Sequence, residues 1–159
     1  MIYCDSSFSA SLYAWDGNTA RANQIYQADG RRPLFFSEWQ ELELVNTLRL
    51  GLFRARRAKM PTPYRLGTCL KRIAEDLRNG ILCRAKLNWP ACVRQASKIS
   101  EQNTEAAGVV MLDIWHVACA VELQATAFWT FDADQEKLAR TTGEFEEVVG
   151  LKAGSLRAL

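Results

Sequence analysis

The chain begins with Met-Ile-Tyr-Cys-Asp-Ser-Ser, residues 1–7, in which a short apolar run ends at an acidic residue. A brief apolar run bounded by polar residues is typical of a buried strand. Ser6 and Ser7 are well suited to cap a helix that follows such a strand. This stretch therefore predicts a strand that leads directly into a helix, with the carboxylate of Asp5 at the junction.

The same alternation of strand and helix patterns continues along the chain. We expect strands over residues 2–4, 34–36, 81–87, 127–131 and 145–149, and helices over residues 8–14, 19–28, 38–57, 64–79, 90–102, 112–123 and 133–142. Such alternation predicts an α/β fold, in which a central, mainly parallel sheet of about five strands carries helices on both faces. We expect one domain over residues 1–149, followed by a loose tail over residues 150–159.

Length and composition narrow the class of protein. The 159 residues are 48% hydrophobic and 24% charged, which is typical of one globular domain. No apolar stretch approaches the roughly 20 residues that a membrane span needs, and the N-terminus lacks the features of a signal peptide. The five cysteines show no Cys-x-x-Cys spacing, which favours free thiols in a reducing compartment. We therefore expect a soluble, cytoplasmic protein with no membrane partner.

His116 is the only histidine in the chain. No cysteine pair stands close to it in the sequence, which disfavours a zinc site. A Ser-His-Asp or Cys-His nucleophile would have to be built around this one residue, and its helix offers Asp113 but no activated serine. The sequence therefore disfavours nucleophilic catalysis.

Four carboxylates, by contrast, stand inside or beside apolar runs far apart in the sequence: Asp5, Glu43, Asp113 and Asp132. An acid in such a place is costly unless it is paired or holds a cation. Asp5 and Asp132 end two of the expected strands, and ligands of parallel sheets bind at the carboxyl ends of strands. The four acids together suggest an all-oxygen site for a hard divalent metal.

Each acid also has a purely structural interpretation. Asp5 and Asp132 could cap the helices that follow them, and Asp113 could complement the dipole of its helix. In the helix over residues 38–57 both faces are substantially apolar, so periodicity does not choose between Glu41 and Glu43. An amide three residues later, Asn46, favours Glu43 modestly because it gives that acid a polar neighbour.

Other side chains near these acids are open to two interpretations. His116, one turn after Asp113, could contact a substrate phosphate or support an acid, or it could be a satisfied structural group. Thr130 could hold a metal-bound water, although a β-branched strand residue needs no such role. Trp115 and Trp129 fit packing better than the stacking of bases.

With these residues in view, the chain resembles the PIN-domain ribonucleases, and among them the VapC-type toxins of bacterial toxin–antitoxin pairs. The resemblance is colinear over about residues 1–143 and rests on four segments: Ile-Tyr-Cys-Asp5-Ser-Ser-Phe, Leu-Glu43-Leu-Val-Asn46, Leu-Asp113-Ile-Trp-His116-Val-Ala-Cys-Ala and Thr130-Phe-Asp132-Ala-Asp-Gln135. It implies a PIN-like three-layer fold, Mg²⁺ or Mn²⁺ bound by the four acids, and support from Thr130. It also favours Glu43 over Glu41.

The chain departs from this subgroup at three places. Asn103-Thr104 stands where His-Thr is frequent, Val109-Val110 where an arginine is frequent, and Asp134 where a basic residue is frequent. The four acids are all present, so the departures concern substrate contacts near the site.

Positive charge is concentrated in the middle of the chain. Between Arg49 and Lys98 lie 13 of the 20 Lys and Arg residues, accompanied by only two acids. Solvated helix faces would give this pattern, and so would a surface for a phosphate-bearing partner. Under the second interpretation the candidate contacts to an RNA backbone are Arg49, Arg54, Arg56 and Arg57.

The favoured hypothesis is a metal-dependent endoribonuclease that acts as the toxin of a toxin–antitoxin pair. The resemblance implies a small antitoxin as partner and a homodimer or a toxin–antitoxin hetero-oligomer. An alternative is a catalytically weak or inactive module that works through antitoxin binding and dimerisation. A flavodoxin-like receiver domain is a third interpretation, weakened because no adjacent acidic pair follows the first strand.

Overall fold

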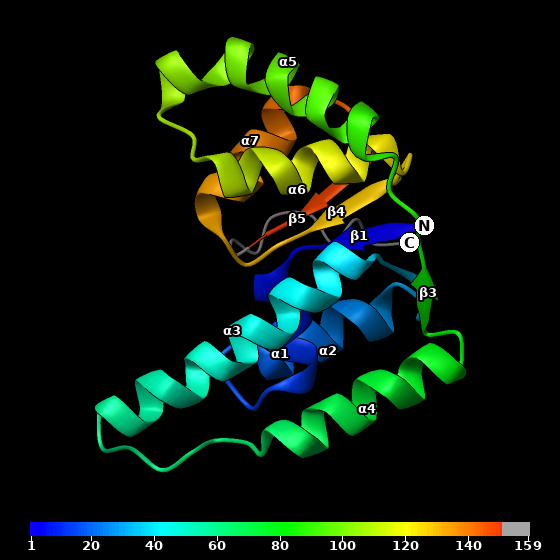
Figure 1. Ribbon diagram of the computed structural model, residues 1–159. Helices are drawn as coiled ribbons and strands as arrows, with labels where there is room; N and C mark the ends of the chain where they lie inside the picture. Colours follow the sequence, from blue (N-terminus) through cyan, green and yellow to red (C-terminus); the bar gives the residue numbers. More distant parts are fainter. Residues whose placement is uncertain (151–159) are drawn as a thin grey trace.

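The computed structural model describes residues 1–150, in which a parallel sheet lies between two layers of helices (Figure 1). Within that range the strands are β1 (Ile2–Cys4), β2 (Leu34–Phe36), β3 (Leu82–Arg84), β4 (Ala127–Trp129) and β5 (Glu147–Val149). The helices there are α1 (Ser6–Tyr13), α2 (Thr19–Ala28), α3 (Glu38–Arg57), α4 (Leu66–Arg78), α5 (Trp89–Ala107), α6 (Met111–Glu122) and α7 (Ala133–Thr142). The predicted α/β fold with helices on both faces is confirmed. Apart from Gly150, the predicted tail lies outside the described residues.

The order of strands in the sheet is β3-β2-β1-β4-β5, and every neighbouring pair is parallel. The chain passes from β1 outward to β2 and β3, then crosses to the other side of β1 to form β4 and β5. The direction of winding therefore reverses between β1 and β4. Cys4 pairs with Trp129, and the Asp5 amide donates to the Trp129 carbonyl over 3.1 Å. The residues that follow these two strands thus meet at the switch point, where such sheets bind ligands.

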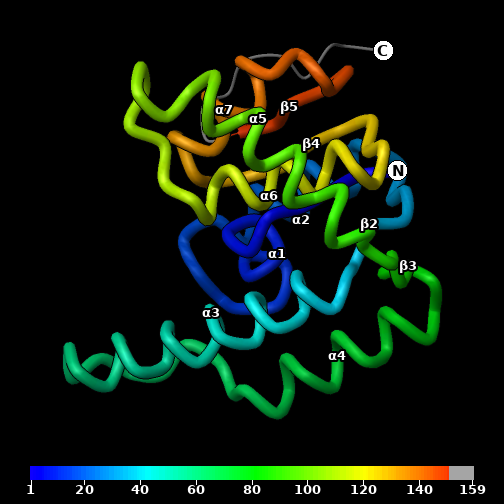
Figure 2. The backbone as a smooth tube through the Cα atoms, turned by 45° about the horizontal axis from the view of Figure 1, so that its top comes forward, coloured from blue at the N-terminus to red at the C-terminus, as the bar shows by residue number. Residues whose placement is uncertain are grey.

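Each face of the sheet has its own apolar core, because successive strand residues point to opposite faces. Ile2 and Cys4 of β1 pack with residues of α1, α2, α3 and α4. Tyr3 points the other way and packs with residues of α5, α6 and α7. Figures 1 and 2 show these two groups of helices on opposite sides of the strands.

The second half of α3 extends away from the sheet, followed by the connection that returns to α4 (Figures 1 and 2). We call this projection, residues 49–66, the arm. It is fastened by Tyr64, whose hydroxyl donates to the Leu48 carbonyl over 2.7 Å. Phe53 and the arginines of the last turn of α3 are exposed on it.

Some element boundaries differ from those expected. Helix α5 continues to Ala107 rather than to residue 102, because no helix breaker occurs before Gly108, which ends the helix in a left-handed conformation. Strand β4 ends at Trp129 rather than at residue 131, because the chain turns there so that Asp132 can cap α7. Strand β3 covers only Leu82–Arg84, the residues that pair with β2.

All five cysteines are free thiols, as expected. No helix in residues 1–150 is both long enough and apolar enough to cross a membrane.

Candidate functional site

Asp5 lies at the carboxyl end of β1 and caps α1. Its carboxylate accepts a hydrogen bond from the Phe8 amide over 2.8 Å, from the Ser7 hydroxyl over 2.8 Å and from the Thr130 hydroxyl over 2.7 Å. The side chain is buried, and burial raises the pKa of this carboxyl, while the nearby His116 and the three hydrogen bonds oppose that rise. Asp5 is therefore a buried acid that its neighbours hold in one orientation.

Asp132 lies at the corresponding place after β4 and caps α7. Its Oδ1 accepts from the amides of Asp134 and Gln135 over 2.9 and 3.0 Å. Thr130 connects it to Asp5, because the threonine hydroxyl donates to Asp5 and accepts from the Asp132 amide over 2.8 Å. The ends of the two central strands are thus joined through one buried hydroxyl.

Asp113 stands in the first turn of α6 and is half-buried. Burial raises the pKa of its carboxyl, and the negative charge of Asp132 raises it further. Asp134 and Asp5 act on it in the same direction. The acids that follow β1 and β4 therefore act electrostatically on Asp113 of α6, and a bound cation would relieve repulsion of this kind.

Glu43 reaches the same region from α3. Its Oε2 lies 2.5 Å from Nε2 of His116 on α6, and the histidine is almost fully buried. Nδ1 of His116 lies 2.9 Å from the hydroxyl of Tyr3 on β1. A hydroxyl that donates to Nδ1 leaves the imidazole proton on Nε2, where it faces Glu43. Among the described residues, Glu43 Oε2 and His116 Nε2 have no other hydrogen-bond partner.

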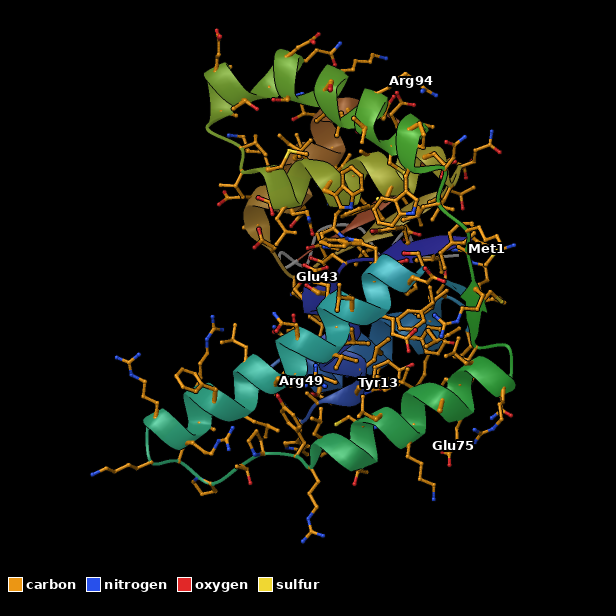
Figure 3. All side chains as sticks on the ribbon, viewed as in Figure 1. Met1, Tyr13, Glu43, Arg49, Glu75 and Arg94 are labelled. Atoms are coloured by element: carbon orange, nitrogen blue, oxygen red, sulfur yellow. The ribbon has the colours of Figure 1, made fainter. Side chains whose placement is uncertain are left out.

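The start of α3 is fixed to the sheet one turn before Glu43. Ser37 and Gln40 form a capping box, in which each side chain bonds to the backbone amide of the other. The side-chain amide of Gln40, through Nε2, also donates to the carbonyl of Cys4 over 2.9 Å and to that of Phe35 over 3.2 Å. These bonds tie α3 to the carboxyl ends of β1 and β2, which sets the position of Glu43 (Figure 3).

The structure distinguishes the two glutamates. Glu43 faces His116, whereas Glu41 pairs with Arg84 at 2.6 Å on a more exposed part of the helix. The expectation that Asn46 is the polar neighbour of Glu43 was wrong, however. Asn46 is exposed, and no hydrogen bond joins it to Glu43 within residues 1–150, because His116 on the facing helix occupies that carboxylate instead.

The other predicted residues are placed as follows. Thr130 is buried and donates to Asp5, so its hydroxyl is engaged by protein in this structure. Arg49, Arg54, Arg56 and Arg57 are exposed along the arm, beyond the acids (Figure 3 labels Arg49). Asn103, at one of the departures, is buried and donates to the carbonyl of Ile99 on its own helix.

Three further residues support the candidate site although the sequence did not indicate that role for them: Tyr3, Ser7 and Gln40. The sequence indicates only a helix cap for Ser7, yet its hydroxyl donates to Asp5 and accepts from the Phe131 amide over 2.8 Å. Tyr3 carried one available signal, because a tyrosine at the centre of a buried strand needs a partner for its hydroxyl. The partner itself, 113 residues away, could not be identified from the sequence.

The donor set fits a hard cation in its chemistry, because carboxylate oxygens are the ligands that Mg²⁺ and Mn²⁺ prefer. Its arrangement does not fit. Over residues 1–150, no group of three or more His, Cys, Asp and Glu side chains is arranged to hold a metal ion. Asp5 and Asp132 cap helices, and Glu43 is paired with His116. Binding of an ion would require these side chains to turn, so the metal site stays a prediction.

No protein-family model matches the chain, and no curated protein matches it either. The resemblance to PIN-domain ribonucleases therefore rests on the four sequence segments.

Proposed function

We propose that this protein is a metal-dependent endoribonuclease that serves as the cytoplasmic toxin of a toxin–antitoxin pair. One observation carries the proposal: Asp5 and Asp132 follow the neighbouring strands β1 and β4 at the switch point, and the charges of both act on Asp113 of α6. Folded proteins seldom gather acids in this way without a cation or a catalytic use for them.

The chain's own residues would divide the work of phosphodiester hydrolysis. Ser7 and Thr130 hold Asp5 in a fixed orientation, and His116 holds Glu43. Exposed cations of the arm would bind the RNA backbone without reading its sequence. A divalent ion, when bound, would activate a water and neutralise charge on the scissile phosphate. The reaction would need no covalent enzyme intermediate.

The test is the cleavage of a labelled single-stranded RNA with Mg²⁺, with Mn²⁺ or with EDTA. We expect cleavage only with metal, and Asp5→Asn should lower it by more than about 100-fold, as expected for a metal ligand. Glu41→Gln is the matched control, because this acid lies on the same helix as Glu43 but faces Arg84. Undiminished cleavage by the Asp5→Asn protein would refute the assignment.

A direct measurement of metal binding separates the site from the reaction. Isothermal titration of the wild-type chain with Mn²⁺ should show binding that the Asp5→Asn variant loses. Because the acids lie close to one another, a bound cation should also raise the melting temperature. No binding at millimolar Mn²⁺ would contradict the metal part of the proposal.

A second candidate function is an inactive module that acts through binding of an antitoxin and dimerisation. The specific observation in its favour is that Asp5, Asp132 and Glu43 are already engaged by protein groups. Expression of the chain without its neighbouring gene separates the candidates. A nuclease should arrest growth and its Asp5→Asn form should not, whereas an inactive module should leave growth unchanged in both cases.

A further inference from the structure

Three tryptophans from three different helices form a continuous aromatic cluster. The ring of Trp89, the first residue of α5, stacks on that of Trp115 in α6, with centroids 5.5 Å apart and planes inclined by 21°. Trp115 in turn meets Trp39 of α3 edge to face at 6.3 Å. Trp89 is 48% exposed. The outer member of the cluster is thus supported by a ring behind it while much of its surface meets solvent.

The inner end of the cluster lies beside the candidate site. The Trp39 ring centroid is 6.4 Å from that of His116, the residue that contacts Glu43. Trp39 also precedes Glu43 by one helical turn, so both project from the same side of α3. The cluster therefore leads from the acids outward to the surface at Trp89.

Positive charge accompanies the outer end. Arg84 and Lys86 are exposed in the segment that connects β3 to Trp89. Arg84 pairs with Glu41 of α3 at 2.6 Å and lies over the Phe36 ring, so its charge is already engaged by protein. Lys86 is an exposed cation three residues before Trp89 in the sequence. An exposed, rigid aromatic ring with a cation close to it is the combination that binds single-stranded nucleic acid, since a base stacks on the ring and the cation binds a phosphate.

We propose that Trp89 is a stacking platform for an unpaired nucleobase of a single-stranded RNA whose backbone passes the acidic site. The inference rests on the proposed function, because an endoribonuclease binds the single-stranded RNA whose base would stack on Trp89. Stacking on an indole tolerates any base, because every base has a flat face. The platform would therefore position the strand without selecting a sequence, and it would exclude a duplex, whose bases are not available for stacking on protein.

The experiment measures the binding of a fluorescein-labelled, unstructured 12-nucleotide RNA to the full chain by anisotropy, in EDTA so that no cleavage occurs. Trp89→Leu should weaken binding about tenfold, and Trp89→Phe should retain more of the affinity because it keeps a flat ring. The matched control is Trp15→Leu, since Trp15 is 75% exposed but stands in the connection between α1 and α2, which pack on the other face of the sheet from α5. Its affinity should equal that of the wild type. A duplex of the same sequence should bind Trp89→Leu and wild type equally.

Three results would overturn the inference: no binding of the RNA by the wild type, equal affinities of wild type and Trp89→Leu, or equal losses in Trp89→Leu and Trp15→Leu. Sedimentation of the same samples tests a rival occupant. If Trp89→Leu converts a dimer to a monomer and leaves affinity per chain unchanged, the surface holds a second copy and the platform is excluded. Thermal unfolding verifies that each variant is folded. Metal-dependent cleavage is scored separately, so a chain that binds RNA through Trp89 but does not cleave it would refute only the proposed function.

Discussion

Glu43 and His116 contact each other from helices that cover opposite faces of the sheet. Both side chains are largely buried, and their facing atoms have no alternative partner within residues 1–150. Removal of either side chain leaves the other buried without a hydrogen-bond partner. This loss lowers the free energy of unfolding by more than the contact itself contributes. The contact therefore holds the two layers in register over the acids.

We expect His116→Ala to destabilise the protein by about 3 kcal/mol, because it strands both Glu43 and the Tyr3 hydroxyl. The double variant Glu43→Ala/His116→Ala should lose less stability than the two single variants added together. The double-mutant cycle should give a coupling energy of at least about 1 kcal/mol. Urea unfolding provides the four free energies. The control is Glu41→Ala, whose exposed pair with Arg84 should be worth less than about 1 kcal/mol. Additive losses at Glu43 and His116 would contradict the contact.

Asp5 should make stability depend on pH in a definite direction. Burial raises its pKa in the folded protein above the value of about 3.9 expected for the unfolded chain. Between these two values the folded state holds a proton that the unfolded state has lost. Protonation of Asp5 therefore increases the free energy of unfolding at low pH. This contribution is lost as pH rises through the pKa of Asp5 in the folded protein.

Asp5→Asn removes this dependence, because asparagine still caps a helix but carries no charge. In EDTA at pH 7 we expect its melting temperature to exceed that of the wild type, and the difference should shrink as pH falls towards about 4. Thermal unfolding between pH 4 and pH 8 measures both effects. Equal melting temperatures of the two proteins at every pH would show that the buried carboxylate carries no such cost.

Among the elements, the bounds of well-capped helices were predictable and the contacts between elements were not. The bounds of α3 and α7 agree with those expected, because a capping serine starts the first and a glycine ends the second. The sequence also placed Asp5 and Asp132 at strand ends. It did not reveal that α3 turns Glu43 towards His116, because that depends on how two helices from opposite layers pack.

The arm is an element whose attachment can be tested at Gly51. A Cβ at this position would come too close to the hydroxyl of Tyr64, which bonds to the Leu48 carbonyl. Alanine favours a helix over glycine by about 1 kcal/mol, but here it would displace a hydrogen bond of similar value. We therefore expect Gly51→Ala to give no net stabilisation in the wild type.

In a Tyr64→Phe background the obstructing hydroxyl is absent, and the next ring atom lies at an ordinary contact distance of 3.5 Å. Gly51→Ala should then stabilise the protein by about 1 kcal/mol. Urea unfolding of the four proteins measures the difference between the effects of the alanine in the two backgrounds. If the alanine has the same effect in both backgrounds, Tyr64 does not fasten the arm as described.

At the scale of the whole molecule, the alternation of strand and helix patterns was sufficient to predict a parallel sheet covered on both faces. The distribution of charge was not predictable in the same way. The basic residues between Arg49 and Lys98 are continuous in sequence, but the chain crosses the sheet between α4 and α5. Arg54 and Arg57 consequently lie on the arm, whereas Arg94 and Lys98 lie on α5 in the other layer (Figure 3 labels Arg94).

This division yields a prediction about RNA binding. If the arm holds the RNA backbone, the double variant Arg54→Gln/Arg57→Gln should lower the slope of log affinity against log salt concentration by about 1.4. Each neutralised phosphate of a single strand contributes about 0.7 to that slope.

The pair Arg94→Gln and Lys98→Gln removes the same net charge from exposed positions on α5. That control should leave the slope nearly unchanged, because net charge alone does not neutralise a particular phosphate. Anisotropy titrations of single-stranded RNA between about 50 and 200 mM salt, the concentration range where such slopes are resolved, provide both values. Equal slopes in the two double variants would show that the basic segment acts only through its total charge, and the arm would then have no specific part in holding RNA.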